Sequence, residues 1–446
     1  MFRINVLLLV FLPLFGFAQQ EEKGIILSPD LHFRTFWMST NYPSDFKNDF
    51  ALGSSLNLGA KARVQKFEFQ VGYRVFANLW SSDLASPDPL TGQPNRYEAG
   101  LFDLLNPRDK FFGKLETLSI SYQRSNWGAS LGRMGINSSW INAQDGRLSP
   151  TAIEGLHTWF STSDDWKFDV WAISRISIRG SSEWFGVGES MGILPVGRDI
   201  NGKPAAYFGN TDSDWIGIFE LSRKWKILSA SFSNTLVENV SNTAWVSADR
   251  NFEKKNVTWI TGIQAGYQIG IGDGGNPDLA LAYKNPKDKN WAISGRFGWK
   301  KGLWTSHLSY TRVGGDGRWL SPREWGKDAW YTFIPRERNE GYQSLDAVTG
   351  YIERQFINQR LIAYLNVGFH WLPDLDYAIA NKYNFPSYRQ INLGLKYKPE
   401  NIKGLDFHLI VMNKEALGKE QLKPNQRYNK VEMIHFNLIG NWRFNQ

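Results

Sequence analysis

The feature that most constrains the fold of this chain is a repeated alternation of apolar and polar residues with a period of two. Clear examples are the segments FEFQVGYRVF, KLETLSISYQ and RQINLGLKYK. This alternation predicts β-strands that have one face toward an apolar environment and one toward a polar one. With the weaker segments included, the pattern predicts eighteen strands. They are expected to start near Leu31, Ser54, Phe67, Lys114, Asn126, Ile153, Trp166, Ser213, Trp225, Thr258, Leu279, Asn290, Gly302, Asp346, Asn358, Tyr388, Leu405 and Lys430.

The connections between these segments differ in length in a regular way. After even-numbered strands most are very short, such as KF near 66 and KG at 301. Long external loops and short periplasmic turns, with an even number of strands, are typical of outer-membrane β-barrels. The glycine-rich GIGDGGNPD near 273 is expected to be one longer periplasmic turn, because no helical pattern follows it. After odd-numbered strands the connections are mostly long, at about 77–113, 135–152, 175–212, 237–257, 314–345, 372–387 and 413–429.

The N-terminal segment MFRINVLLLVFLPLFGFA has the pattern of a secretory signal peptide, with one basic residue, a short apolar run and small residues near its end. Its apolar run is shorter than the roughly 20 residues of a spanning helix. We therefore expect residues 1–18 to be cleaved, 19–30 to form a short periplasmic segment, and 31–446 to form one barrel domain. The 20 Trp and the 15% aromatic content fit the aromatic girdles of such a barrel.

Composition also narrows the possible chemistry. The chain has no cysteine, which excludes disulfides, thiol nucleophiles and cysteine-based metal sites. The six histidines form no HExxH motif and there is no GxSxG, so we predict no enzyme and no catalytic, cofactor or metal site. In an exported barrel the net charge of +8 favours small anionic or zwitterionic solutes, outer-membrane lipid and lipopolysaccharide as partners, rather than nucleic acid.

The segment WINAQDGRLSPTAIEG, residues 140–155, is a compact group of turn-forming and charged residues after the fifth predicted strand. It is therefore the third external loop. Asp145 and Gly146 predict a tight turn, Pro150 stiffens its exit, and Arg147 offers a planar donor suited to carboxylates. The residues alone slightly favour an ordinary surface turn over a loop that folds back into the lumen.

At this loop the chain resembles a known family. INAQDGRLSPTAIEGLHTWFST resembles the third-loop signature of the OprD-type outer-membrane porins, and the segments LHFRTFWM and NLGLKYKPENIKGLDFHLIVMN are similar to family regions at matching positions. The resemblance spans most of the mature chain but is specific only around the third loop. It implies an 18-stranded, substrate-selective channel for small, often carboxylate-bearing solutes. In that family the third loop, here with Asp145, Arg147 and Ser149, narrows the lumen opposite a ladder of basic side chains.

The phase of the strands predicts such a basic wall independently. Inward-facing cations are expected on the early and late strands, which become neighbours when the barrel closes. A row of these cations would lower the barrier for carboxylates. The alternative is that they are ordinary lumen charges paired with Glu68, Asp406 or Glu432. The predicted wall comprises Arg34, Lys61, Arg63, Arg74, Arg360, Lys396 and Arg443.

These observations predict a porin in the outer membrane of a Gram-negative-type bacterium. It would be a monomer or trimer that lets small hydrophilic solutes diffuse passively, with a preference for carboxylates. A sugar-conducting porin is the nearest alternative. From other classes, an outer-membrane barrel enzyme, with His157 near Ser161 or Ser163, and a loop-mediated adhesin or scaffold stay open. The sequence does not decide whether the seventh loop, about 314–345, also narrows the lumen.

Overall fold

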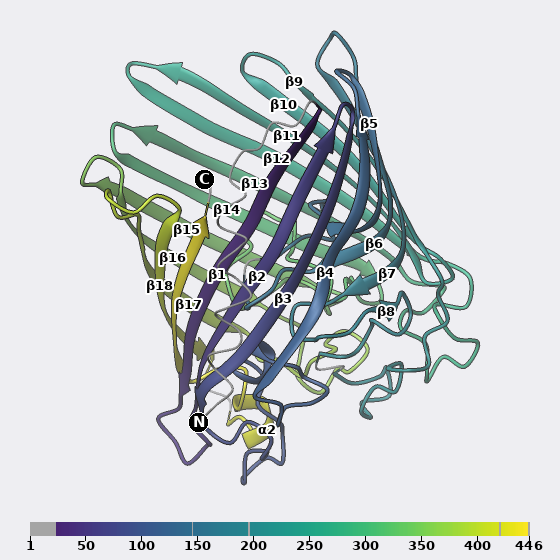
Figure 1. Ribbon diagram of the computed structural model, residues 1–446. Helices are drawn as coiled ribbons and strands as arrows, with labels where there is room; N and C mark the ends of the chain where they lie inside the picture. Colours follow the sequence, from purple (N-terminus) through teal and green to yellow (C-terminus); the bar gives the residue numbers. More distant parts are fainter. Residues whose placement is uncertain (1–23, 145, 195–196, 419–420, 445–446) are drawn as a thin grey trace, which may run out of the picture.

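The computed structural model describes residues 24–144, 146–194, 197–418 and 421–444. Within them, antiparallel strands form one sheet that closes on itself where β1 (Ile25–Asn41) pairs with β19 (Met433–Phe444) (Figure 1). The two-residue β8 (Phe185–Gly186) only extends β7 inside a loop, so the barrel wall of the described chain has eighteen strands. The predicted fold class, a transmembrane antiparallel β-barrel, is confirmed.

The remaining wall strands follow one another in chain order. They are β2 (Asp49–Val64), β3 (Phe67–Ser81), β4 (Phe111–Gln123), β5 (Trp127–Gly135), β6 (Ala152–Ser161), β7 (Trp166–Ser177), β9 (Ile216–Lys224), β10 (Leu228–Val237), β11 (Ser241–Lys254), β12 (Val257–Gly270), β13 (Lys289–Lys301), β14 (Trp304–Asp316), β15 (Leu345–Phe356), β16 (Leu361–Trp371), β17 (Tyr388–Tyr397) and β18 (Leu405–Ala416). Two short helices, η2 (Ala99–Leu101) and α2 (Pro424–Arg427), lie in loops. Among the described residues, no helix is long and apolar enough to cross a membrane.

Alternation along each strand separates an apolar outer face from a polar inner one. On β17, Leu393 and Leu395 are exposed on the outside, whereas Gln390 and Asn392 are fully buried on the inside. Large apolar side chains such as Leu308 stay 60% exposed on the outer face. Because a soluble protein rarely leaves so many large apolar side chains in water, this outer face is suited to lipid.

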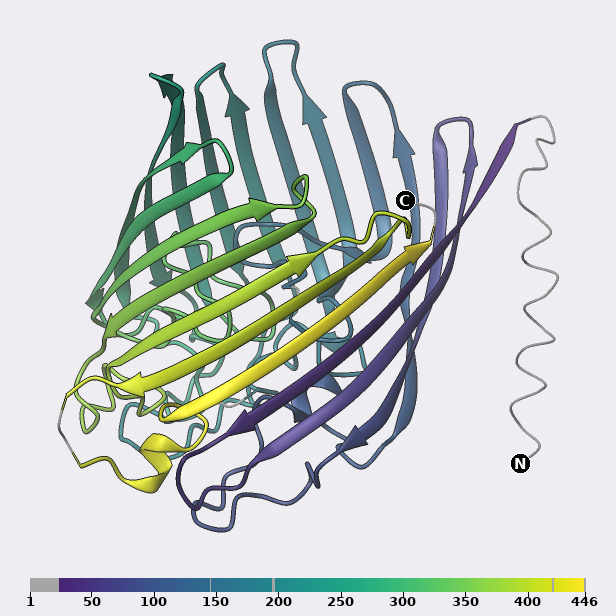
Figure 2. The same ribbon diagram turned by 90° about the vertical axis from the view of Figure 1, so that its left-hand side faces the viewer.

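The two ends of the barrel differ in their connections. One end, the turn end, carries eight short connections: 65–66, 124–126, 162–165, 225–227, 255–256, 302–303, 357–360 and 398–404. The other, the loop end, carries nine loops: L1 (42–48), L2 (82–110), L3 (136–151), L4 (178–215), L5 (238–240), L6 (271–288), L7 (317–344), L8 (372–387) and L9 (417–432). Figure 2 shows the turns toward the top and loop segments inside the barrel.

Two predicted strands differ from the structure, although the total is right. No strand starts near Leu279, which lies in L6, and β11 occupies the place of the long loop predicted at 237–257. The outer face of β11 carries Asn242, Ala244 and Arg250, so its apolar signal is weak. The GIGDGGNPD segment is part of L6 at the loop end and is not a periplasmic turn. The first strand begins at Ile25, so residues 25–30, predicted to precede the barrel, pair with β2.

The apolar core lies inside the loop end of the barrel, where the loops pack against one another and against the wall. L7 makes the largest contribution, because Trp319, Trp325 and Trp330 are each at most 2% exposed. L7 therefore fills part of the lumen. The sequence alone did not decide whether this seventh loop enters it.

Candidate functional site

L3 enters the barrel and packs on L7. The ring centroid of Trp140 lies 5.7 Å from that of Trp319 and 5.4 Å from that of Trp330. On the opposite side of L3, the Ser55 hydroxyl of β2 donates a 2.8 Å hydrogen bond to the carbonyl of Leu148. These contacts fix L3 between the wall and L7, inside the lumen.

Hydrogen bonds join L3 and L7 along their length. The Asn142 side chain donates to the carbonyl of Lys327 at 3.2 Å and accepts from its backbone N–H at 3.0 Å. Arg338 Nη2 donates to the Gln144 side-chain oxygen at 2.6 Å. Because each contact joins residues far apart in the sequence, the two loops form one constriction.

The constriction encloses a narrow cavity of about 60 Å³ whose lining is dominated by arginine. These arginines, called here the arginine cluster, come from L2, L3, L4 and L7. They are Arg96, Arg147, Arg179, Arg323, Arg336 and Arg338. Tyr97, Gln144, Leu194 and Phe333 complete the lining with Glu337, the only carboxylate among the described lining residues.

Glu337 compensates one part of the cluster. Its carboxylate lies 2.9 Å from Lys414 Nζ, 3.2 Å from Arg323 Nη1 and 3.4 Å from Arg96 Nη2. Burial opposes ionisation of this group, but Lys414, Arg96 and Arg323 outweigh burial and hold the pKa of Glu337 well below its usual range. Arg323 also pairs with Glu340. This part of the cluster is a buried network of ion pairs.

The part of the cluster around Arg147 and Arg179 differs from this network in the described part of the chain. Arg147 is 8% exposed, and its guanidinium donates to the carbonyl of the neighbouring Gly146. Among the described residues, no carboxylate forms an ion pair with Arg147 or Arg179. Burial and the nearby charge of Arg336 lower the pKa of Arg147, and burial and Arg147 lower that of Arg179. Since guanidinium stays charged at neutral pH, an entering anion would relieve this repulsion.

Two glycines allow the close approach of these side chains. A Cβ atom on Gly100, in η2, would lie 2.6 Å from Arg147 Nε. A Cβ atom on Gly146 would lie 3.3 Å from Arg336 Nη1 and 3.4 Å from Arg179 Nη1. Glycine at both positions therefore lets L2 and L3 hold three guanidinium groups near one backbone turn.

The predicted constriction residues have different outcomes. Arg147 lies in the arginine cluster. Ser149 is buried in L3 and does not line the cavity. Asp145 lies outside the described residues. The other five arginines were not predicted from the sequence, and only Arg336 and Arg338 stand in a conspicuous charged segment, PRERNEG of L7.

The predicted basic wall is largely neutralised by acidic partners. Arg74 forms two hydrogen bonds with Glu116, at 2.6 and 2.8 Å. Other pairs are Arg443 with Asp406 at 2.7 Å, Arg63 with Glu68 at 2.6 Å, Lys61 with Asp30 at 3.9 Å, and Arg360 with Glu400.

The two remaining members of the wall have uncharged partners. Arg34 donates to Asn441 at 2.6 Å, and Lys396 lies over the Tyr364 ring at 5.4 Å. The structure brings Arg34 and Arg443 near each other through Asn441, which donates to Asp406 at 2.8 Å. It places Lys61, Arg63 and Arg360 at the turn end.

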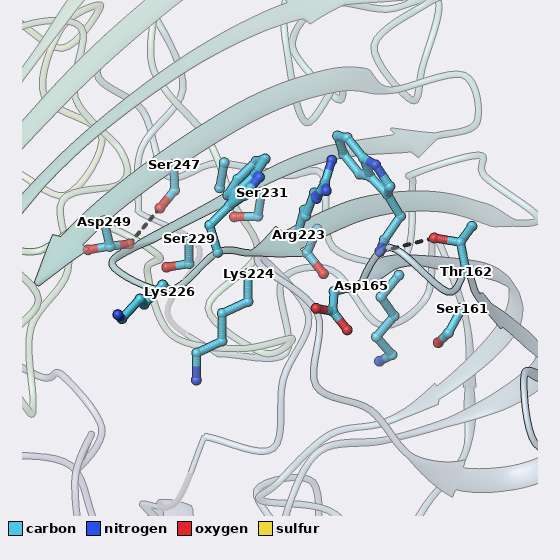
Figure 3. Close-up of a pocket in the computed structure, with 15 residues that line it drawn as sticks. Ser161, Thr162, Asp165, Arg223, Lys224, Lys226, Ser229, Ser231, Ser247 and Asp249 are labelled. Carbon is cyan, nitrogen blue, oxygen red and sulfur yellow. Dashed lines mark hydrogen bonds between the residues drawn. The ribbon is translucent and has the colours of Figure 1, made fainter.

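Another hollow, of about 730 Å³, lies at the turn-end tips of β6, β7, β9, β10 and β11. Figure 3 shows its polar lining, in which Ser161, Thr162 and Ser229 accompany Lys224 and Asp165. The residues considered for an enzyme lie on this side of the barrel. There, His157 stacks on Trp171 with ring centroids 3.6 Å apart and its Nε2 lies 3.0 Å from Asp169.

No protein-family model and no curated protein sequence matches the chain. Solved structures do. OccK9 (OpdG) of Pseudomonas aeruginosa has a TM-score of 0.73 at 12% identity, covering 94% of this chain and 98% of that chain. OpdK of the same organism, solved with vanillate, has a TM-score of 0.71 at 13% identity, and OccAB2 of Acinetobacter baumannii 0.70 at 13%, both with the same coverage.

At this level of identity the comparison shows the fold. The strand number, the loop asymmetry and the inward third loop all agree with the resemblance of the third-loop segment to the OprD-type porins. The chain therefore has the fold of the OprD-type outer-membrane porins.

Proposed function

We propose that this protein is an outer-membrane porin through which small hydrophilic solutes diffuse passively, with a preference for solutes that carry a carboxylate. The arginine cluster is the observation that carries the proposal. It surrounds the constriction with six guanidinium groups, and the carboxylate of Glu337 is already shared among Lys414, Arg96 and Arg323. Arg147 and Arg179 then offer planar donors to a passing anion.

Transport of this kind needs no covalent step. A guanidinium fork matches a carboxylate in shape and charge, so the cluster lowers the energy of that group at the narrowest point. The neighbouring Tyr97 and Phe333 supply ring surface for an apolar part of the solute. One structural neighbour, OpdK, was solved with vanillate, an aromatic carboxylate. That compound is therefore a reasonable first solute to test.

One observation favours a sugar-conducting porin as the second candidate. The inner face of β10 to β14 carries many hydroxyl groups, which include Ser233, Thr235, Ser247, Ser294 and Thr311. Hydroxyl groups would exchange hydrogen bonds with a sugar without requiring charge.

Ion selectivity in planar bilayers separates the candidates. The refolded barrel would be compared with the double variant R147Q/R179Q by reversal potential across a KCl gradient. We expect anion preference in the parent and a shift toward cations in the variant. Block of the chloride current by added vanillate should also weaken. The matched control is R250Q/R354Q, which removes two arginines from the outer face and should behave like the parent.

Open channels with equal ion preference in all three proteins would refute carboxylate selectivity and favour the sugar route. A correctly folded barrel that never conducts would refute the porin itself.

A further inference from the structure

Four arginines near the turn end lie on aromatic rings of the outer face. The centre of the Arg223 guanidinium lies 5.1 Å from the Trp166 ring and 5.0 Å from the Trp225 ring. That of Arg354 lies 5.1 Å from Trp304 and 4.8 Å from Phe356. The remaining two pairs are Arg250 over Phe252 at 5.1 Å and Arg124 over Tyr122 at 5.9 Å. We call these four residues the arginine ring.

Strand register places Arg223, Arg250 and Arg354 on the side that faces lipid. Arg124 lies in a turn, and its Nε donates a 2.8 Å hydrogen bond to the hydroxyl of Tyr122, which is paired with the exposed Phe67. Arg223 is paired across strands with Trp166, and Arg354 with Trp304. Two further residues on the same faces of these strands, Phe219 and Ile352, are each 37% exposed. Figure 3 shows Arg223 on the opposite side of its hairpin from Lys224, as alternation requires. The ring therefore does not belong to the lumen.

Within the part of the chain that the structure describes, the arginine ring also lacks acidic partners. Among the described residues, no carboxylate forms an ion pair with any of its four members. At the loop end, by contrast, three outward-facing arginines have acidic partners, and one of them, Arg133, pairs with Glu154 at 2.7 Å. The other two such pairs are Arg312 with Asp346 and Arg389 with Glu415. The four members of the arginine ring therefore differ from these three arginines in having no carboxylate partner among the described residues.

The charge of the connections also differs between the two ends of the barrel. The eight turns contain seven basic and three acidic residues, whereas the nine loops contain 20 basic and 24 acidic residues. The basic surplus that suggested lipopolysaccharide as a partner is therefore not carried by the loops. A cation held on an aromatic girdle sits at the depth of the lipid headgroups. Its natural counter-ion there is a phosphate.

We propose that the arginine ring binds the phosphodiester headgroups of anionic phospholipids in the leaflet at the turn end. Each aromatic ring orients a guanidinium plane along the barrel surface, and the free N–H groups of that plane donate to phosphate oxygens. Because turns are periplasmic in outer-membrane barrels, this leaflet is the periplasmic one, an assignment that rests on the proposed function. The headgroup contact itself depends only on the barrel surface.

Native mass spectrometry of the refolded full chain tests the proposal. The protein would be equilibrated in non-ionic detergent with equal amounts of phosphatidylglycerol and phosphatidylcholine, and the retained lipids would be counted. One basic residue near an anionic lipid surface contributes about fivefold in binding. We therefore expect the parent to retain phosphatidylglycerol at least about tenfold over phosphatidylcholine. The variant R124Q/R223Q/R250Q/R354Q should retain both lipids about equally.

Controls distinguish binding by the arginine ring from a general effect of positive charge at the turn end. The variant R63Q/R360Q/R443Q removes three arginines from the same end, each paired with a carboxylate, and should keep the preference. Adding inorganic phosphate should not displace the lipid, and displacement would contradict a lipid site. The proposal is also overturned if the parent shows no preference, or if the fourfold variant, folded by its heat-shifted electrophoretic mobility, keeps it.

This result is independent of conduction. A conducting barrel without lipid preference would refute only the proposed lipid site at the arginine ring. A lipid-selective barrel that does not conduct would refute only the proposed porin function.

Discussion

At the scale of single residues, two buried carboxyl groups near the constriction have pKa values that are shifted in opposite directions. Glu337 is held ionised by three cations, as described above. Glu98, at the start of η2 in L2, is fully buried, and its neighbours are mainly neutral. Thr40 and Asn95 donate hydrogen bonds to it at 2.6 and 2.7 Å, and His435 Nδ1 lies 3.8 Å away. Burial raises the pKa of Glu98 to about 7. The pKa values of two glutamates near one site are thus shifted in opposite directions by their different surroundings.

This difference predicts a pH-dependent selectivity. A glutamate has a pKa of about 4.3 in an unfolded chain. The folded chain therefore binds an extra proton between about pH 4 and pH 7, and stability falls as pH rises through this window. Glu98 precedes η2, whose Gly100 lies next to Arg147. Above pH 7 the negative charge of Glu98 therefore partly cancels the positive charge that Arg147 offers to an anion. We expect the anion preference to fall between about pH 6 and pH 8, measured by reversal potential. The variant E98Q should show no such change, and a fall of equal size in E98Q would contradict this assignment.

At the scale of elements, the proposed function gives L7 the role of setting the width of the pore. An eighteen-stranded barrel is wide unless its lumen is filled. L7 fills it with Trp319, Trp325 and Trp330 and supplies three members of the arginine cluster. Replacing residues 322–339 with a short Gly-Ser linker should leave the barrel folded, because no wall strand pairs with them. Single-channel conductance should rise roughly threefold or more. The same replacement at 276–282 of L6 is the control, and unchanged conductance in the L7 variant would mean that L7 does not obstruct the path.

The same scale shows what the sequence could predict. Strands with large outward residues, such as Leu393 and Leu395 of β17, were found because alternation reports a lipid-facing side. The pattern did not predict β11, because Ala244 and Arg250 on its outer side weaken the apolar alternation. The arginine cluster was not predictable, because its members come from four loops whose packing no local pattern encodes. Arg34 and Arg74 of the predicted wall are buried, but alternation along one strand cannot show an acidic partner on the next, such as Glu116 beside Arg74.

At the scale of the whole molecule, the charges of the two ends form a field along the pore axis. The turns are net basic and the loops net acidic, and the connections lie at opposite ends of the same channel. Such an arrangement concentrates anions at one mouth and repels them at the other. The effect depends on salt, because the screening length is about 10 Å at 0.1 M and about 3 Å at 1 M.

This field predicts a rectifying channel. For barrels inserted in one orientation, currents at equal voltages of opposite sign should differ at about 0.1 M KCl and become nearly equal at about 1 M. Neutralising turn lysines in K226Q/K255Q/K398Q/K403Q should reduce the asymmetry, because it removes the basic end of the field. Neutralising loop lysines in K203Q/K287Q/K423Q should increase it, because the loop end becomes more acidic. An asymmetry that persists unchanged at high salt, or that both variants alter in the same direction, would point to pore shape rather than to charge as its cause.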